Sequence, residues 1–311
     1  MRLNSNMNYG VKWLHGLQFG LSDLGESHKI ATPEYGGTTQ HCRVYKHKGE
    51  WTTDWSESMI MFGNCWHKTQ RWIHPDTIPA TTQWHYWDNP ELPHLLYQDE
   101  HNPLGYKNWC RFVTNHTHTQ ANTGGGIERI NNQLQQLNKS TRNWTWEKLL
   151  QGRHDVVISP VKKTVLLCPP SISVFEHYYG ISVREWKINW IQLLESRGYR
   201  VRIRHKPGRS QREENRNRLY QQLDKVAFTV SIHSASAVES ILAGVPAVVD
   251  GRSCAGPLGT PAQEYKETNQ LRLPTVEEQN LWVDQILANT FHKQELYDGS
   301  WWKTKGEQHA I

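Results

Sequence analysis

Two kinds of hydrophobic pattern divide the chain near its middle. In the second half, short apolar runs alternate with segments whose apolar residues recur every three or four positions. The runs Thr164–Cys168, Val226–Val230 and Pro246–Val249 have the length and composition of strands buried on both faces. The segments Val183–Arg197 and Val276–Ala288 have the period of amphipathic helices. This alternation predicts an α/β fold with a parallel, Rossmann-like sheet.

The first half of the chain has a weaker pattern, because its hydrophobic periodicity is poor and residues typical of turns are frequent. The pattern predicts a helix at Val11–Gly25 and a buried strand at Ser58–Gly63. It also predicts an alternating strand at Trp84–Asp88, which ends in a carboxylate. The change in character between the halves predicts two domains, residues 1–150 and residues 151–311.

The most informative segment is Val230–Pro246, VSIHSASAVESILAGVP, in which a buried strand leads through small residues into a helix. Ligands of open parallel sheets bind at the carboxyl ends of the strands, and the first turn of a helix attracts phosphate. Ser234 and Ser236 are small enough for an anion to approach the backbone, and either can cap the helix. Glu239, one turn later, is suited to accept hydrogen bonds from ribose hydroxyls. The spacing alone also fits an ordinary strand-to-helix turn with a solvated glutamate.

A second strand end carries another candidate. The strand Thr164–Cys168 ends at two prolines, and Ser171 follows them. Ser171 is therefore either a phosphate contact at the same edge of the sheet or part of a structural turn.

Charge and composition narrow the class of protein. The net charge is +5, and Arg197–Arg218 carries nine basic and two acidic residues, which favours an anionic partner such as a nucleotide or DNA. The five cysteines are widely spaced and form no CxxC pair, so we expect no zinc ribbon and no disulfide framework. No apolar run is long enough to span a membrane and the N-terminus lacks the apolar core of a signal peptide. We therefore expect a cytoplasmic protein with no membrane partner.

The segment HSASAVESILAGVPAVV resembles the donor-site segment of GT-B glycosyltransferases. The order CPPS, a tryptophan-bearing helix, RIRHKP, HSASAVES, GVPAVV and GRSCAGPLG resembles glycosyltransferase-like proteins of tailed phages and marine viruses. In the first half, QWHYWDNPE and GYKNWCRFVTNHTHTQ resemble two further blocks of that group. The resemblance covers about residues 55–302. It implies a GT-B-like fold of two Rossmann-like domains facing a cleft, with the C-terminal tail packing back toward the N-terminal domain.

The resemblance also implies roles for the donor side. Residues 151–311 would bind a nucleotide-sugar, a UDP-sugar such as UDP-glucose, as co-substrate with no further cofactor. The matching motif residues are His233, Ser234, Ser236 and Glu239. Lys206 matches the lysine that would neutralise the leaving diphosphate. GT-B enzymes generally work without a bound metal, and the sequence contains no DxD motif, so we expect no metal site.

Residues 1–150 would bind the acceptor. Transfer to a hydroxyl needs a general base, for which Asp88 is the first candidate and His15 a weaker one. Arg111 and Asn115 match the second block and would hold polar groups, and Trp87 offers a flat face for stacking on a sugar or a base.

The acceptor stays open at this stage. A phage-like enzyme with a basic stripe suits a 5-hydroxymethylpyrimidine, such as 5-hydroxymethylcytosine, in double-stranded DNA, and we expect a monomer. A surface polysaccharide or a small metabolite fits the same fold, as does a nucleotide-sugar epimerase that needs no acceptor. A non-enzymatic DNA-binding protein is the alternative from another class.

Overall fold

The chain forms two compact units. One consists of Met1–Asn143 together with Gln285–Ile311, and the other of Trp144–Asp284. The sequence predicted a second domain of residues 151–311. In the structure, Gln285–Ile311 belongs to the first unit instead. The computed structural model describes residues 44–47, 50–53, 58–62, 80, 83–88, 91–92, 109–116, 124–136, 155–170, 180–205, 216–232, 234–249, 252–292, 294–295 and 300–301.

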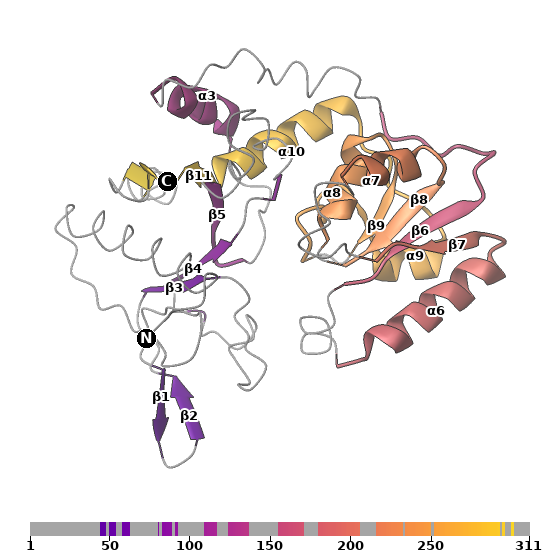
Figure 1. Cartoon of the computed structure of the whole chain (residues 1–311), viewed down its shortest axis with the longest axis horizontal. Helices are drawn as coiled ribbons and strands as arrows, with labels where there is room; N and C mark the ends of the chain where they lie inside the picture. The colour runs from indigo at the N-terminus through magenta and orange to yellow at the C-terminus, as the bar shows by residue number, and fades with distance from the viewer. Residues whose placement is uncertain are drawn as a thin grey trace. The chain divides into compact units, whose positions relative to one another are not determined.

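The second unit is built, in its described part, on a five-stranded parallel sheet with the order β10-β9-β8-β6-β7 (Figure 1). The strands are β6 (Thr164–Cys168), β7 (Arg200–Ile203), β8 (Phe228–Ser231), β9 (Ala247–Val249) and β10 (Thr260–Pro261). The central strands β6, β8 and β9 are almost wholly buried and β7 is largely exposed. Burial on both faces explains their continuous apolar runs, and the predicted α/β class with a parallel sheet is confirmed for this unit.

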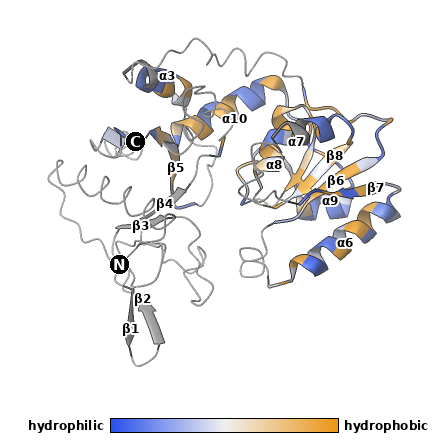
Figure 2. Ribbon diagram, viewed as in Figure 1, coloured by the Kyte–Doolittle hydropathy of each residue, from blue (hydrophilic) through white to orange (hydrophobic). Residues whose placement is uncertain are grey.

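Helices cover both faces of this sheet. They are α6 (Val183–Ser196), α7 (Arg216–Leu223), α8 (Ala235–Leu242) and α9 (Ala262–Thr268). Because successive residues of a strand point to opposite faces, β6 contributes to two apolar clusters. Val165 and Leu167 pack with side chains of α6 and α9, whereas Leu166 and Cys168 pack with side chains of α7. Figure 2 shows the matching pattern, with apolar central strands and helices that carry both kinds of residue.

The first unit contains a mixed sheet with the order β11-β5-β4-β3 among the described residues. Its strands are β3 (Ser58–Phe62), β4 (Gln83–Asp88), β5 (Trp109–Thr114) and β11 (Thr290–His292). The two strands predicted in this half are confirmed as β3 and β4, which pair in parallel. β4 and β5 are antiparallel, as are β5 and β11, unlike the parallel strands expected of a Rossmann-like domain. Antiparallel neighbours need no crossover helix, which agrees with the weak helical period of this half.

Two smaller elements complete the first unit's described part. Strands β1 (Val44–His47) and β2 (Glu50–Thr53) form an antiparallel pair. Helix α3 (Gly126–Gln136) contains Arg129, whose contacts with the C-terminal residues are described below. The helix predicted at Val11–Gly25 lies outside the described residues.

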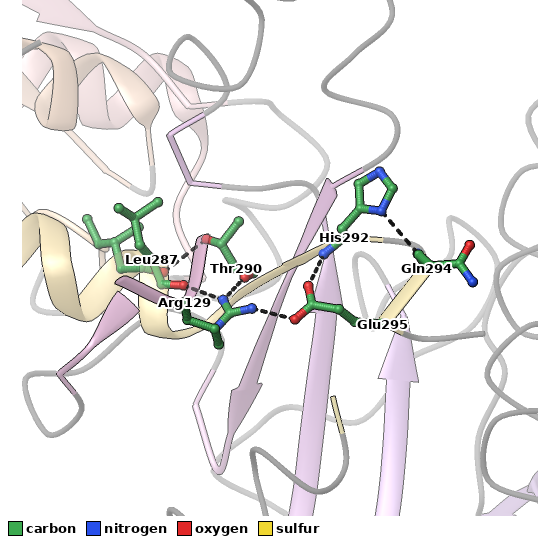
Figure 3. Close-up of polar contacts among 7 residues, drawn as sticks. Arg129, Leu287, Thr290, His292, Gln294 and Glu295 are labelled. Carbon is green, nitrogen blue, oxygen red and sulfur yellow. Dashed lines mark hydrogen bonds and ion pairs between the residues drawn. The ribbon is translucent and has the colours of Figure 1, made fainter. Parts of the chain in front are cut away.

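Helix α10 (Val276–Ala288) has the predicted bounds and carries the chain from the second unit into the first. Arg129 of α3 holds its C-terminal end (Figure 3). One guanidinium nitrogen, Nη2, donates to the backbone carbonyls of Leu287 and Thr290, while Nη1 donates to Glu295 Oε1 at 2.7 Å. Glu295 Oε2 also accepts the backbone N–H of His292 at 2.6 Å. The last carbonyls of a helix have no partner within it, and Arg129 satisfies that of Leu287. By also bonding the carbonyl of Thr290, it fixes the turn into β11.

We expect Arg129→Met to destabilise the protein by about 3 kcal/mol, because it leaves the buried Glu295 carboxylate without its ion-pair partner. The free energy of unfolding from urea titration measures the effect. The double variant Arg129→Met/Glu295→Gln is the control and should recover part of the loss, since it removes the unpaired charge. Equal stability of Arg129→Met and the unsubstituted protein would contradict this account of the ion pair.

A capping box begins α10. Thr275 Oγ1 accepts the backbone N–H of Glu278 at 3.2 Å, and Glu278 Oε2 accepts the backbone N–H of Thr275 at 2.8 Å. Arg272 Nη2 donates to Glu278 Oε1 at 2.9 Å. The Thr275 N–H and then the Arg272 guanidinium hold the pKa of the Glu278 carboxyl below its ordinary value.

This lowered pKa predicts a pH-dependent contribution to stability. A carboxyl whose pKa is lower in the folded than in the unfolded state stabilises the fold above the unfolded pKa, and the gain is lost as the pH falls through the folded pKa. The melting temperature of Glu278→Gln should therefore lie below that of the unsubstituted protein at pH 7, and the gap should close under acid conditions. Glu277→Gln, which changes a carboxylate in the same turn outside the capping box, should show a smaller gap. A gap that is constant with pH would count against the capping box as its source.

Candidate functional site

The strand order of the second unit defines a point where a ligand can bind. From β6 the chain passes to β7 on one side and then returns to β8 on the other, so the direction of winding reverses between β6 and β8. Open α/β sheets bind ligands at the carboxyl ends of the strands that flank such a reversal. Cys168 ends β6, Ser231 ends β8, and the two are register partners. The site is built around these two strand ends.

The N-terminus of α8 follows directly after β8. Ser234 is its cap residue, as predicted, with extended backbone angles of φ −100° and ψ 136°. Ser234 Oγ accepts the backbone N–H of Ser236 at 3.2 Å, and Ser236 Oγ donates to Ser234 Oγ at 2.7 Å. Small residues therefore surround the positive end of the helix, where free N–H groups favour an anion. Beyond the helix, Gly244 adopts a left-handed φ of 73° and lets the chain turn into β9.

Cys168 ends β6 at the same edge of the sheet. Its side chain is buried, and burial raises the pKa of the thiol. Three neighbours also act on that pKa: the Ser236 side chain, by a hydrogen bond, and the charge of Arg204 lower it, while the charge of Glu239 raises it. Ser236 and Glu239 belong to α8, which follows β8, and Arg204 follows β7, so these residues come from the two strands that flank β6.

Arg204 reaches this cluster because β7 continues beside β6. Its backbone N–H donates to the carbonyl of Leu167 at 2.8 Å, which carries the strand pairing one residue past Ile203. In the sequence, Arg202 and Arg204 alternate with Val201 and Ile203, a pattern that fits either a charged face beside Lys206 or the exposed side of an edge strand. Cys168 and Ser231 were not singled out, since a buried thiol and a strand serine are common in protein cores. Only the pairing of β6 with β8 and β7 brings the three residues together.

The arrangement suits an anion that also carries hydroxyl groups. The helix N-terminus and the Arg204 guanidinium supply positive charge, and the serine hydroxyls supply hydrogen bonds. The half-buried Glu239 carboxylate, one helical turn further on, suits a ligand's hydroxyl donors. Ser234, the cap predicted for this helix, Ser236 and Glu239 all lie in the first two turns of α8, and their role in binding stays a prediction. His233, Lys206, Ser171 and His15 lie outside the described residues.

The described candidates of the first unit lie on or directly after the antiparallel strands β4 and β5, with Asp88 and Asn115 toward opposite ends of the pair. Trp87 and Asp88 end β4, and Asp88 is the register partner of Arg111 in β5. Arg111 is buried, with Nη1 at 3.7 Å from Glu91 Oε1 and its guanidinium carbon 5.2 Å from the centre of the Tyr86 ring. Its described contacts thus lie inside the unit.

Asn115 follows β5 directly. It is exposed and has a left-handed φ of 58°, a conformation that asparagine tolerates better than most residues. Its side chain is therefore accessible at the end of β5, as an acceptor-binding role requires. The side chains of Asp88 and Trp87 lie outside the described part of the structure.

The loop after β9 borders the sheet edge that carries the site. Gly259 packs tightly at its end, where an added Cβ would lie 2.5 Å from Val249 Cγ2 and 3.0 Å from the carbonyl oxygen of Ala255. The Trp282 indole N–H donates to the carbonyl of Cys254 at 2.9 Å and holds the middle of the loop. Both contacts fix the loop against the body of the second unit.

Among the described residues, no cluster of three or more His, Cys, Asp or Glu side chains is suited to hold a metal ion. The same part of the chain contains no helix with the length and apolar character needed to cross a bilayer. Comparisons of the chain with protein-family models, with curated proteins and with solved structures gave no match.

We expect Gly259→Ala to destabilise the second unit by about 1–3 kcal/mol, because the new methyl group has no room beside Val249. Urea denaturation of the purified variant measures the loss. In the background of Val249→Ala, where the nearest atom is removed, the same substitution should cost less. An unchanged cost in both backgrounds would show that Val249 is not the source of the strain.

Proposed function

We propose that the protein is a glycosyltransferase of the GT-B type that transfers a sugar from a nucleotide-sugar, such as UDP-glucose, to a hydroxyl group. The observation that carries this proposal is the cluster at the carboxyl ends of β6 and β8. There α8 begins with a capped N-terminus and two serines that bond to each other, Glu239 lies one turn into the helix, and Arg204 extends the pairing of β7 with β6. The HSASAVES motif, which resembles the GT-B donor segment, coincides with this cluster.

On the donor side, the diphosphate would bind against the first turn of α8, in contact with Ser234 and Ser236. Arg204 supplies positive charge there, and Lys206, two residues further along the basic stretch, would add to it. Glu239 would accept hydrogen bonds from the ribose hydroxyls. His233 and Ser171, next to the same strand ends in sequence, would complete the contacts to the donor.

The reaction breaks the bond between the anomeric carbon and the diphosphate oxygen and forms a bond from that carbon to the acceptor oxygen. The acceptor proton passes to a general base, for which we propose Asp88, or else His15. The leaving nucleoside diphosphate keeps the electron pair of the broken bond. The helix N-terminus and the cationic side chains stabilise its growing charge without a metal ion.

The acceptor that we propose is a 5-hydroxymethylpyrimidine in double-stranded DNA. The basic stretch Arg197–Arg218 suits a phosphate backbone, and Trp87 and Asn115 would contact the extruded base. Arg111 would act from the interior of its unit by supporting the end of β4.

Glu239→Ala should weaken binding of UDP-glucose at least tenfold, since two hydrogen bonds to a charged group are lost. Isothermal titration calorimetry on the full chain measures the affinity. Glu264→Ala, which removes an exposed carboxylate from α9, is the matched control and should bind as the unsubstituted protein does. Equal affinity of Glu239→Ala and the control would overturn the donor-site assignment.

A transfer assay tests the reaction itself. The protein is incubated with UDP-glucose and DNA containing 5-hydroxymethylcytosine, and the digested nucleosides are analysed by mass spectrometry. A hexose added to the modified base would support both the activity and the acceptor. Release of nucleoside diphosphate without a DNA adduct would retain the glycosyltransferase and reject this acceptor. Conversion of the sugar without any acceptor would instead identify an epimerase.

A further inference from the structure

Strand β7 is the outermost strand on one side of the parallel sheet (Figure 1). Among the described strands it pairs only with β6, and its residues Arg200, Arg202 and Ile203 are exposed. Because successive side chains of a strand point to opposite faces, Arg200 and Arg202 share one face. Arg204 continues this face, since its backbone N–H extends the pairing with β6. These three residues form a row of arginines along the open edge of the sheet, here called the arginine row.

The register with β6 shows on which face of the sheet the arginine row lies. Arg202 is the partner of Leu166, which packs with Leu219 and Leu223 of α7. Val201, which points to the other face, packs against the cluster that contains side chains of α6 and α9. The arginine row therefore lies on the face that α7 covers.

The two faces of the sheet differ in charge near β7. Helix α7 carries Arg216 and Arg218 and no acidic residue. Helices α6 and α9, on the opposite face, together carry more acidic than basic residues. Basic residues are thus concentrated on one face, whereas charges of both signs are mixed on the other. A one-sided concentration of arginine is the electrostatic footprint expected of a surface that binds a polyanion.

The structure also separates the arginine row from Arg197, the first residue of the basic stretch. Arg197 Nη1 donates to the carbonyl of Tyr265 at 3.0 Å and Nη2 to that of Lys266 at 2.6 Å, so Arg197 holds the end of α9. Within the described part of the chain, the guanidinium groups of Arg200 and Arg202 form no hydrogen bond or ion pair. They are exposed and can meet an external partner.

We propose that the arginine row binds the phosphate backbone of duplex DNA and holds the acceptor by contacts that do not depend on base sequence. Alternate residues of a strand are about 7 Å apart, close to the separation of successive phosphates along one nucleic-acid strand. Guanidinium groups bind phosphate oxygens by charge-assisted hydrogen bonds, and such contacts position DNA without reading its bases. This inference rests on the proposed function for the choice of DNA and adds the surface that holds it.

The direction of the row fits this role. Arg200 lies at the start of β7, and Arg204 follows its carboxyl end, the edge of the sheet at which the candidate donor site lies. A DNA backbone bound along the row would therefore lead toward that edge. The row would thus keep the acceptor near the donor site whether or not a modified base is present.

Two other roles for exposed arginines make different predictions. Charged side chains on an edge strand discourage pairing with other chains, and charge of either sign serves that purpose. Pairing of β7 with a second copy of itself would bring arginines opposite arginines on one face, which is unfavourable. Binding of phosphate, unlike protection of the edge, requires positive charge at Arg200 and Arg202.

The test measures binding of the full chain to a short, unmodified, fluorescein-labelled DNA duplex by fluorescence anisotropy over a range of salt concentrations. Each phosphate contact contributes about 0.9 to the slope of log affinity against log salt concentration. Arg200→Gln/Arg202→Gln should therefore reduce the magnitude of this slope by about 2 and weaken binding about tenfold at low salt. Arg200→Lys/Arg202→Lys keeps both charges and should keep the slope.

Arg184→Gln/Lys266→Gln is the matched control, because it removes two exposed positive charges from α6 and α9 on the opposite face of the sheet. It should change the slope little. The arginine positions are exposed, so thermal unfolding of the glutamine variant should match that of the unsubstituted protein and checks its fold. Equal slopes for the glutamine variant and the matched control would overturn the arginine row while the proposed function stands.

Titration with UDP-glucose separates the two proposals. A chain that binds UDP-glucose but no duplex would overturn the arginine row and the DNA acceptor and retain the glycosyltransferase. A chain that binds no UDP-glucose, but binds DNA in a way that the glutamine variant loses, would support the arginine row and overturn the proposed function. If polyglutamate displaces the labelled duplex as well as unlabelled duplex of equal charge does, the assignment to DNA phosphates is wrong.

Discussion

The parallel pairing of β6 with β8 is the constraint on which the second unit depends. Leu166, Leu167 and Val230 in these strands are almost fully buried, so both strands must be covered on both faces and can pair only inside a helix-covered sheet. With β7 on the far side of β6, the same pairing creates the reversal in the direction of winding. The apolar content of two short strands thus determines both the core and the place at which Cys168 and Ser231 meet.

Polar groups at this place are costly to bury, and the structure satisfies most of them locally. Ser234 and Ser236 bond to each other at the start of α8, and Ser240 Oγ, near the other end of that helix, donates to the carbonyl of Val245 at 3.0 Å. Ser231 and Thr229 of β8 both have a buried hydroxyl with no hydrogen-bond partner among the described residues. Natural proteins retain such groups mainly where function requires them, because an apolar residue of the same size would be less costly.

The first unit depends on contacts between distant parts of the chain. Strand β11 joins β5, and the N–H of Phe112 donates to the carbonyl of Asn289 at 2.8 Å. Arg129 then closes the turn between α10 and β11. The C-terminal residues therefore complete this unit, although they follow the second unit in the sequence. A domain boundary drawn once along the chain does not describe such an arrangement, because the contacts that define a unit need not be contiguous in sequence.

The sequence by itself determined the elements whose pattern is local and strong. Apolar runs, helical period and turn residues act over a few positions and predict several elements directly. These are the strands β6, β8 and β9, the helices α6 and α10 and the Ser234 cap. The tertiary structure decided the antiparallel pairing of β5, in which the buried Arg111 forms an ion pair with Glu91, and the place of β6 between β7 and β8. Such features depend on which distant residue supplies the partner for a buried charge or dipole. A local sequence pattern does not predict which residue that is.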